Sequence, residues 1–441
     1  MKVGDIIELD ILSNGMDGEG VARVDGMVVF VPYTLMGERV RAKVVKVKRS
    51  YAVCSCIKVL SPSEHRKTPS CPHYYKCGGC DMGHVDPEYR QKVLIDELKN
   101  NLNKIADIDA GDVEFIRSPE KRGLRNKLSM PFGLSNGKVI LGLYKQNTHA
   151  VQPVECGMSG SIAQTVSKIV CDFANSKKLS VYDFDSGRGL LRHLVVREIG
   201  GRASVTLVIN GQSFDGEKAL SVELPDTVDF FVCPNTKRNN VIMGDSVRLV
   251  RGKPRLDIDV MGVKAKLSPL SFLQVNDYIR DRLYSDVIGA LSSPVLVDLF
   301  SGIGITSNLA ANAGKTVTAV ECVPQAVRDA DETAKLNGNA DKIKNVCGKV
   351  EDVIGSVVDG IKDFDVLIDP PRKGCGEGVM QAIANCKPNK LIYVSCNHAT
   401  MCRDIRAFLD ASPDYEIIDL KLYDMFPNTH HTETLICLTR N

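Results

Sequence analysis

Three short apolar runs that each end in polar or glycine-rich residues constrain this chain most. Residues 391–397 read Leu-Ile-Tyr-Val-Ser-Cys-Asn, residues 364–372 read Phe-Asp-Val-Leu-Ile-Asp-Pro-Pro-Arg, and residues 295–304 read Val-Leu-Val-Asp-Leu-Phe-Ser-Gly-Ile-Gly. Apolar runs of this length without a helical period are typical of buried parallel strands. Ligands of open α/β sheets bind at the carboxyl ends of such strands. The pattern therefore predicts a ligand site at one edge of a sheet.

A fourth apolar run, residues 434–438, follows Glu433. If this last strand is antiparallel to the others, it begins at the edge where the strand before Cys396 ends. A thiol and a carboxylate would then face one pocket. The two prolines after Asp369 stop that strand and stiffen the loop that carries Arg372. Cys375 and Cys402 are the nearest alternative thiols.

Length, charge and cysteine usage narrow the class of protein. A chain of 441 residues is expected to form two or three domains. We see no signal peptide and no membrane-length apolar run, so we expect a cytoplasmic protein without a membrane partner, and a monomer. Fifteen cysteines in such a chain favour metal or catalytic roles over disulfides. The net charge of +2 means that any nucleic-acid surface is local.

Residues 1–60 predict a small β-barrel, because short apolar strands alternate with Asn-Gly and Asp-Gly turns. Residues 39–49 contain six basic residues and no acid. This run is either a charged edge strand that resists aggregation or a surface that binds phosphates. Further on, residues 117–127 are again basic around Asn126, which fits a solvated loop or an RNA contact.

A cysteine cluster follows the barrel. Cys71, Cys77 and Cys80 are separated by five and then two residues, a clustering that can hold zinc or an iron–sulfur centre. His73 and His84 keep zinc open as an alternative. A four-thiolate centre needs a further ligand from elsewhere in the chain.

The loop after residue 300 indicates a nucleotide-type cofactor. Gly302 and Gly304 form a tight turn after a strand, and Glu321 ends the next strand, where its carboxylate can bind ribose hydroxyls. Dinucleotide-binding proteins share both features. The third glycine of their fingerprint is replaced by Ser307, which argues against a pyrophosphate-containing nicotinamide cofactor. S-adenosylmethionine has no pyrophosphate and does not need that glycine.

Taken in order and spacing, residues 298–304, 369–372, 395–397 and 431–433 resemble the RNA uracil-C5-methyltransferase family. One departure is His398, where the family usually has proline after Ser-Cys-Asn. The barrel resembles a TRAM domain, which binds RNA, and the cysteines resemble the three-plus-one set of the 23S ribosomal RNA branch, which holds a [4Fe–4S] cluster. The resemblance covers essentially the whole chain.

The resemblance implies an α/β fold with a Rossmann-like S-adenosylmethionine methyltransferase domain, an N-terminal OB-like TRAM barrel and a central α+β domain. The expected boundaries are 1–60 for the barrel, 61–261 for the central domain and 262–441 for the catalytic domain. An amphipathic helix at about 86–106 is expected to pack on the catalytic domain.

The implied reaction is methylation of C5 of a uridine, most simply in 23S ribosomal RNA. A thiolate must add to C6 to make C5 nucleophilic, and a base must then remove the C5 proton. The target base must also swing out of the folded RNA. The resemblance assigns Cys396 as nucleophile and Glu433 as base. It assigns cofactor contacts to Gln274, Phe300, Gly302, Glu321 and Asp369. It assigns substrate contacts to Phe272, Arg125, Asn126 and Arg372. It assigns cluster ligation to Cys71, Cys77, Cys80 and Cys156.

Three alternatives stay open at the level of sequence. The same reaction could act on transfer RNA. The chain could be a non-catalytic RNA-binding or assembly protein on this scaffold. It could also be an iron–sulfur oxidoreductase that uses a nicotinamide.

Overall fold

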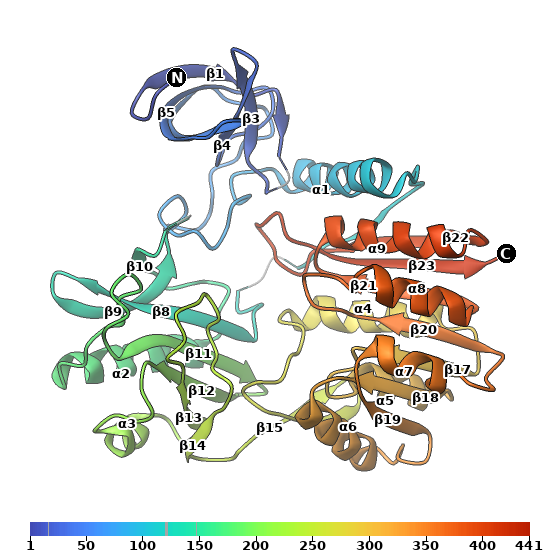
Figure 1. Cartoon of the computed structure of the whole chain (residues 1–441). Coiled ribbons are helices and arrows are strands. Elements are labelled where there is room, and N and C mark those ends of the chain that lie inside the picture. The colour runs from blue at the N-terminus through green and yellow to red at the C-terminus, as the bar shows by residue number, and fades with distance from the viewer. Residues whose placement is uncertain (16, 120–121, 147) are drawn as a thin grey trace. The chain divides into compact units, whose positions relative to one another are not determined.

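A computed structural model describes residues 1–15, 17–119, 122–146 and 148–441 (Figure 1). The chain divides into two compact units. The first unit comprises residues 1–111 with the short segments 145–147 and 426–432, and the second comprises residues 112–144, 148–425 and 433–441. Residues 120 and 121 of the basic segment before Asn126 lie outside the described residues.

The first unit begins with a curled six-stranded sheet in the order β1-β5-β6-β4-β3-β2. Its strands are β1 (Ile6–Asp10), β2 (Ser13–Asn14), β3 (Gly20–Val24), β4 (Met27–Val31), β5 (Arg39–Val47) and β6 (Tyr51–Ser61). Along β5, Val40, Ala42 and Val44 are buried in the core while Arg39 and Arg41 are exposed. This alternation is the one expected of a strand with one solvated face. Both arginines contact Glu8 on β1, at 3.3 and 2.9 Å.

A helix follows the cysteine segment. The helix α1 (Pro87–Asn101) starts with Pro87 at its first position and is capped by Asp86, whose side chain accepts from the N–H groups of Glu88 and Tyr89. It continues as a π-helical turn, η1 (Leu102–Ala106), and ends at Asp107 in a left-handed conformation. The helix expected at about 86–106 is therefore present.

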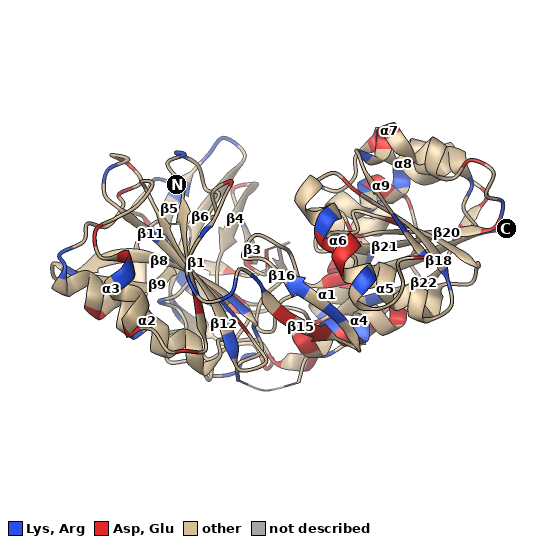
Figure 2. Cartoon of the chain, turned by 90° about the horizontal axis from the view of Figure 1, so that it is seen from below, with Lys and Arg blue, Asp and Glu red and all other residues tan. Residues whose placement is uncertain are grey.

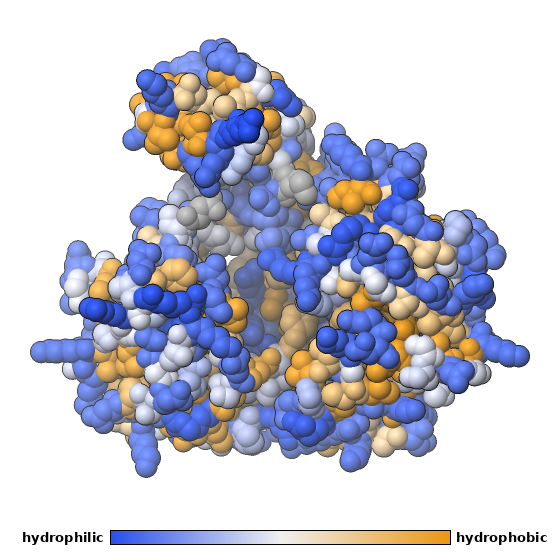
Figure 3. Space-filling model, in the orientation of Figure 1, coloured by the Kyte–Doolittle hydropathy of each residue, from blue (hydrophilic) through white to orange (hydrophobic). Residues whose placement is uncertain are grey.

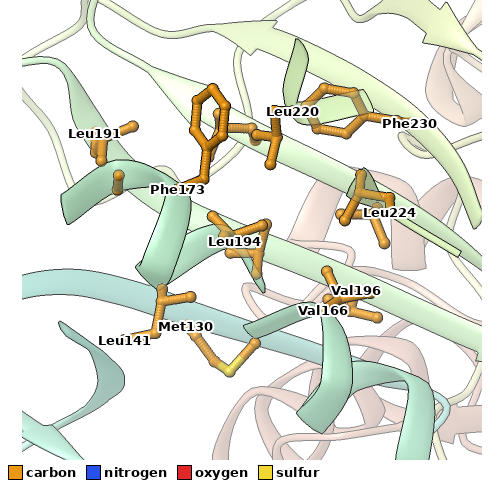
Figure 4. Packing of buried hydrophobic residues seen from close by; sticks show 14 of the residues in the cluster. Met130, Leu141, Val166, Phe173, Leu191, Leu194, Val196, Leu220, Leu224 and Phe230 are labelled. Atoms are coloured by element: carbon orange, nitrogen blue, oxygen red, sulfur yellow. The ribbon is translucent and has the colours of Figure 1, made fainter. Parts of the chain in front are cut away.

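The second unit contains a seven-stranded sheet in the order β10-β9-β8-β11-β12-β13-β14. Its strands are β8 (Lys127–Ser135), β9 (Lys138–Tyr144), β10 (Val151–Pro153), β11 (Leu191–Ile199), β12 (Arg202–Ile209), β13 (Val228–Pro234) and β14 (Arg248–Arg251). Two helices, α2 (Ser161–Ser176) and α3 (Glu217–Glu223), supply Val166, Phe173 and Leu220 to the core on one face of this sheet (Figure 4).

The same unit contains an eight-stranded sheet in the order β19-β18-β17-β20-β21-β23-β22-β7. Its strands are β7 (Glu114–Ile116), β17 (Val295–Leu299), β18 (Thr316–Glu321), β19 (Ile343–Cys347), β20 (Phe364–Ile368), β21 (Lys390–Ser395), β22 (Tyr415–Tyr423) and β23 (Glu433–Arg440). Strands β17 to β21 are mutually parallel, and β23 is antiparallel to β21. The strand order reverses between β17 and β20, the position where open α/β sheets bind ligands.

Helices cover both faces of this sheet. The helices are α4 (Asp277–Ala290), α5 (Ile305–Asn312), α6 (Pro324–Leu336), α7 (Val350–Val357), α8 (Glu377–Cys386) and α9 (His398–Ala411). Figure 2 shows α7, α8 and α9 together on one side of the strands and α4 and α5 on the other. The α/β fold with a doubly wound sheet is confirmed.

One expected boundary falls inside a secondary-structure element. The hairpin β15 (Leu256–Val260) and β16 (Val263–Leu267) turns at Met261 and Gly262, both with positive φ. The boundary placed after residue 261 therefore lies at the tip of a continuous hairpin, where the turn signal is strongest.

No helix in the described part of the chain is long and apolar enough to cross a membrane. The face of the molecule in Figure 3 is mainly hydrophilic, with smaller apolar patches between the charged residues.

Candidate active site

The end of β21 and the start of β23 lie side by side. Ser395, the last residue of β21, pairs with Thr434 in the antiparallel register. Cys396 directly follows the one strand, and Glu433 opens the other. The expectation that the last strand begins at the edge where Cys396 lies is therefore confirmed.

The turn after Cys396 is fixed by local hydrogen bonds. Asn397 caps α9, its side chain accepting from the N–H of Thr400 at 3.1 Å. The Ser395 hydroxyl accepts from the N–H of Asn397, also at 3.1 Å. His398 takes the first helical position and is buried. Proline is favoured at that position because its φ suits the first turn. Here the Asn397 cap holds the turn without it.

Helix α9 also holds the loop that carries Arg372. The Thr400 hydroxyl donates to the Arg372 carbonyl at 3.2 Å. Asp404 is fully buried and accepts from the N–H of Cys375 and from the Tyr393 hydroxyl, both at 2.7 Å. The sequence reasoning missed Asp404. Its only signal was an acid among the apolar positions of an amphipathic helix.

The alternative thiols are less suited to attack. Cys402 is completely buried, and burial raises its pKa to about 12. Burial also raises the pKa of Cys375, whose N–H is committed to Asp404. Cys396 is half-buried and borders ionisable groups of two other segments, the loop after β20 and the start of β23.

Four ionisable side chains interact electrostatically and therefore form one site: Cys396, Glu433, Asp369 and Arg372. Burial and the Glu433 charge raise the pKa of the Cys396 thiol to about 11, and a hydrogen bond from Arg372 opposes this rise. Glu433 is 3% exposed. Burial and Asp369 hold its pKa well above the ordinary range, while a hydrogen bond from Gln274 and the Arg372 charge oppose that shift. A pKa of about 11 means that the Cys396 thiol is mainly protonated at neutral pH.

Asp298 adds a further carboxyl to this acidic site, next to Asp369. Burial and the charge of Asp298 raise the pKa of Asp369 to about 7. Burial raises the pKa of Asp298 to about 6, opposed by hydrogen bonds from Ser307 and Thr306. The Ser307 hydroxyl reaches Asp298 at 2.6 Å. The serine at the third glycine position therefore has a structural role that the sequence reasoning did not foresee.

The expected cofactor loop has the geometry of a close turn. Phe300 (φ 62°), Gly302 (φ 55°) and Gly304 (φ 78°) all have left-handed backbone conformations. A Cβ at position 304 would approach the Cβ of Ala330 to 3.2 Å, so glycine also allows close packing there. The Glu321 carboxylate ends β18 and accepts from the N–H of Gly302 at 3.2 Å. Gly302 and Glu321, both predicted cofactor contacts, thus lie together.

The segment before α4 connects the seven-stranded sheet with the acidic site. Phe272 is 68% exposed, whereas Gln274 is buried and donates to Glu433. The Asn126 amide donates to the Gln274 carbonyl at 3.0 Å and to Asp277 at 2.8 Å. Arg125 forms a β-bridge with Asn276. Asn126 is buried, and its amide is committed to shaping this segment, so a contact with substrate remains a prediction.

The cysteines divide between the two units. Cys71 is exposed, Cys77 and Cys80 are half-buried, and all three belong to the first unit, whereas Cys156 belongs to the second. The N–H of Gly79 donates to the Cys77 sulfur at 3.2 Å, a contact that suits a thiolate. His84 is buried, with Nδ1 hydrogen-bonded to the Tyr74 hydroxyl. In the described part of the chain, no three His, Cys, Asp or Glu side chains are grouped to hold a metal ion.

The fold and this site define a doubly wound α/β protein that carries a glycine turn, a thiol and a buried carboxyl at one sheet edge. Two family patterns match the chain: tRNA (uracil-5-)-methyltransferase over residues 353–441, and the TRAM domain over residues 1–53. A protein of Caldanaerobacter subterraneus named as an uncharacterized RNA methyltransferase is 33% identical, with 100% of this chain and 99% of the relative covered. One of the same description from Halalkalibacterium halodurans is 33% identical over 98% of this chain and 97% of its own length.

A solved structure has the same fold. The Pyrococcus abyssi tRNA (uracil-54, C5)-methyltransferase, in complex with S-adenosyl-L-homocysteine, has a TM-score of 0.80 and 23% identity, covering 98% of this chain and 99% of its own. The chain belongs to the RNA (uracil-5-)-methyltransferase family, and its first residues form a TRAM domain. The predicted family and enzyme class are confirmed.

Proposed function

We propose that this protein transfers a methyl group from S-adenosylmethionine to C5 of a uridine in 23S ribosomal RNA, acting as a cytoplasmic monomer. The observation that carries the proposal is the meeting of Cys396, Glu433 and Arg372 at one sheet edge. A nucleophile, a base and a cation are the groups that methylation at C5 requires.

In this mechanism, Cys396 Sγ gives its proton to water and bonds to C6 of the uracil, and the electron pair of the C5–C6 double bond moves onto C5 and O4. The hydrogen bond from Arg372 favours the thiolate needed for this attack. S-adenosylmethionine would supply the methyl that C5 takes, with its S–CH3 bond breaking and S-adenosylhomocysteine as the leaving group. Glu433 then removes the C5 proton, and the electron pair left behind re-forms the C5–C6 double bond as the bond between Sγ and C6 breaks. The thiolate is thereby regenerated.

The acidity of the site favours a cationic cofactor. Asp298, Asp369 and Glu433 are buried, and burial raises the pKa of each. A sulfonium charge nearby would favour their ionised forms, including the form of Glu433 that can act as a base. A pyrophosphate would be repelled by the same carboxylates. This charge distribution supports S-adenosylmethionine over a nicotinamide dinucleotide and disfavours the oxidoreductase alternative.

Transfer RNA is the second candidate substrate. The Pyrococcus abyssi structure, a tRNA (uracil-54, C5)-methyltransferase, covers 98% of this chain. A barrel before the catalytic domain therefore does not by itself separate the two substrates. The cysteine segment supports the ribosomal substrate, because the resemblance links this motif to that branch.

We also propose that Cys71, Cys77, Cys80 and Cys156 hold a [4Fe–4S] cluster. Soft thiolates and the amide donor at Gly79 suit such a centre. The methyl transfer itself needs no redox step, so the proposed role is to order the segment that carries the first three cysteines.

The deciding experiment uses RNA labelled with tritium at uracil C5. Wild-type protein is expected to release tritium to water only when S-adenosylmethionine is present, and Cys396→Ala is expected to release none. Cys386→Ser, which alters a half-buried thiol at the C-terminal end of α8, is the matched control and should behave like wild type. Release from transfer RNA but not from ribosomal RNA would select the second substrate. No release from either RNA would overturn the proposal.

A further inference from the structure

Two cations lie on the face of the seven-stranded sheet that is turned away from its main core. Leu128 and Val196 point into that core, the latter labelled in Figure 4. Because side chains alternate along a strand, the neighbouring Lys127 and Arg197 point to the opposite face. The two residues are register partners on the adjacent strands β8 and β11. Directly paired like charges normally destabilise a sheet.

Neither cation has a carboxylate partner. Arg197 is 3% exposed, and its Nη2 donates to the Ser271 carbonyl at 3.0 Å. Its Nε and Nη1 are buried and have no hydrogen-bond partner among the residues that the structure describes. In the described part of the chain, no Asp or Glu forms an ion pair with Lys127 or Arg197. The charge of Asp277 acts on Arg197, but the Asp277 carboxylate is itself bonded to Arg280 at 2.6 Å.

This arrangement of two desolvated cations is energetically unfavourable without an anion beside them. Burial and the charge of Arg197 lower the pKa of Lys127 to about 8. Burial lowers the pKa of Arg197 itself to about 10. Buried charges are normally paired, because desolvation without a partner is unfavourable. Lys127 is only partly buried, so an anion can reach it. The negative charge of that anion would stabilise the charges of both Lys127 and Arg197.

We propose that Lys127, supported by Arg197, binds a phosphate of the substrate RNA backbone next to the target uridine. This inference rests on the proposed function.

The surroundings favour a phosphate over the cofactor's carboxylate. Arg197 is bonded to Ser271, the residue before Phe272, whose ring is largely exposed and suited to stack on a base. Two residues later, Gln274 contacts Glu433. The cations therefore adjoin the segment that leads to the reacting base. The expected cofactor loop instead lies around Gly302 and Glu321. The acidic site repels phosphates, so a cation beside it is needed to hold the strand.

The test is a salt titration of RNA binding. Lys127→Gln should weaken binding of the substrate RNA about 5- to 10-fold at low salt and reduce the slope of log affinity against log salt by about one. The kcat/KM for RNA should fall by the same factor. Lys138→Gln removes an exposed lysine from the same sheet and should change neither quantity. Lys127→Arg keeps the charge and should retain the wild-type slope of log affinity against log salt. This variant therefore distinguishes the effect of a lost charge from the effect of misfolding.

Each contrary result has a distinct meaning. An unchanged salt slope in Lys127→Gln, with cofactor-dependent tritium release intact, would overturn the phosphate site and leave the proposed function standing. Weaker S-adenosylmethionine binding with unchanged RNA binding would assign the cations to the cofactor and also overturn it. Absence of tritium release in the wild type would instead overturn the proposed function.

Discussion

Asp81 accepts two hydrogen bonds from His430 and thereby holds the loop that precedes Glu433. Its carboxylate accepts from the His430 N–H at 2.9 Å and lies 2.6 Å from the ring Nδ1. The N–H of Met82 also donates to the Asn428 carbonyl at 2.9 Å, and Arg90 of α1 donates to the Thr429 carbonyl at 2.7 Å. Asp81 directly follows Cys80, so the cysteine segment and residues 426–432 are ordered together within the first unit.

The first prediction concerns this contact. Asp81→Asn keeps the shape of the side chain but removes its charge, so the two hydrogen bonds from His430 weaken. Hydrogen bonds to charged groups contribute roughly 1.5–3 kcal/mol each, and we expect the loop to open more often by a comparable free energy. Hydrogen–deuterium exchange of peptides covering 426–432 measures this directly.

The control for that variant is Asp17→Asn. Asp17 also approaches His430, but at 3.7 Å and with its side chain 84% exposed. Exposed pairs contribute about 0–1 kcal/mol, so this variant should leave exchange nearly unchanged. Equal protection of the loop in Asp81→Asn and wild type would show that the hydrogen bonds from His430 to Asp81 do not hold the loop.

The second prediction separates the base from the nucleophile. Glu433→Gln keeps Cys396 able to attack C6 but removes the group that takes the C5 proton. Turnover should fall by about 10²- to 10⁴-fold, and a covalent protein–RNA adduct should accumulate on denaturing gels. Cys396→Ala should form no adduct. Glu416→Gln changes an exposed glutamate on the neighbouring strand β22 and should turn over like wild type. Full proton release by Glu433→Gln would remove Glu433 from the mechanism.

How much of this site the sequence could reveal depends on the range of the interactions. Strand ends, prolines and the order of the motifs are local signals, and they located Cys396, Asp369 and Glu433 on one sheet edge. The hydrogen bond from Ser307 to Asp298 joins residues that are 9 positions apart. The hydrogen bond between His430 and Asp81 joins residues that are 349 positions apart. No periodicity encodes such pairs. Asn126 shows the converse, because a basic, polar setting suggested a contact with RNA while the fold buries its amide against Gln274.

The third prediction is a pH dependence that distinguishes two related ligands. The pKa of Asp369 rises to about 7 in the folded chain from an ordinary value of 3.8. A sulfonium binds best when the nearby carboxylates are ionised. S-adenosylmethionine affinity should therefore increase from about pH 6 to about pH 8. The neutral thioether S-adenosylhomocysteine should show a much smaller increase. Calorimetric titration of both ligands gives the comparison, and parallel curves would exclude the electrostatic argument.

The fourth prediction concerns stability and follows from the same shift. A carboxyl whose pKa is raised by folding binds protons in the native state that the unfolded chain releases. The free energy of unfolding therefore decreases as the pH rises from about 4 through about 7. Asp369→Asn should remove this loss and stabilise the empty protein at about pH 8 by roughly 1–4 kcal/mol. Asp341→Asn, which changes a carboxylate at an exposed turn, should leave the stability at this pH unchanged. Denaturant unfolding at both pH values measures the effect, and equal pH slopes in Asp369→Asn and wild type would refute it.

The last prediction tests how α9 positions the Arg372 loop. Asp404 accepts hydrogen bonds from the N–H groups of Cys375 and Gly376 and from the Tyr393 hydroxyl. Asp404→Ala leaves these buried donors unpaired, and each such loss costs about 1–3 kcal/mol. We expect a large fall in stability and, in the fraction that stays folded, a higher KM for RNA because Arg372 is no longer held against Cys396.

Asp410→Ala removes an exposed carboxylate from the same helix, where it pairs with Arg406 at 2.8 Å. Its effect should stay within about 1 kcal/mol. Asp404→Asn retains acceptor capacity and should recover part of the stability lost in Asp404→Ala. If Asp404→Ala and Asp410→Ala proved equally mild, the Arg372 loop would have to be held by its two prolines and by the Thr400 bond to the Arg372 carbonyl. The order of the three variants therefore shows whether rigidity beside the thiol depends on the buried carboxylate of Asp404.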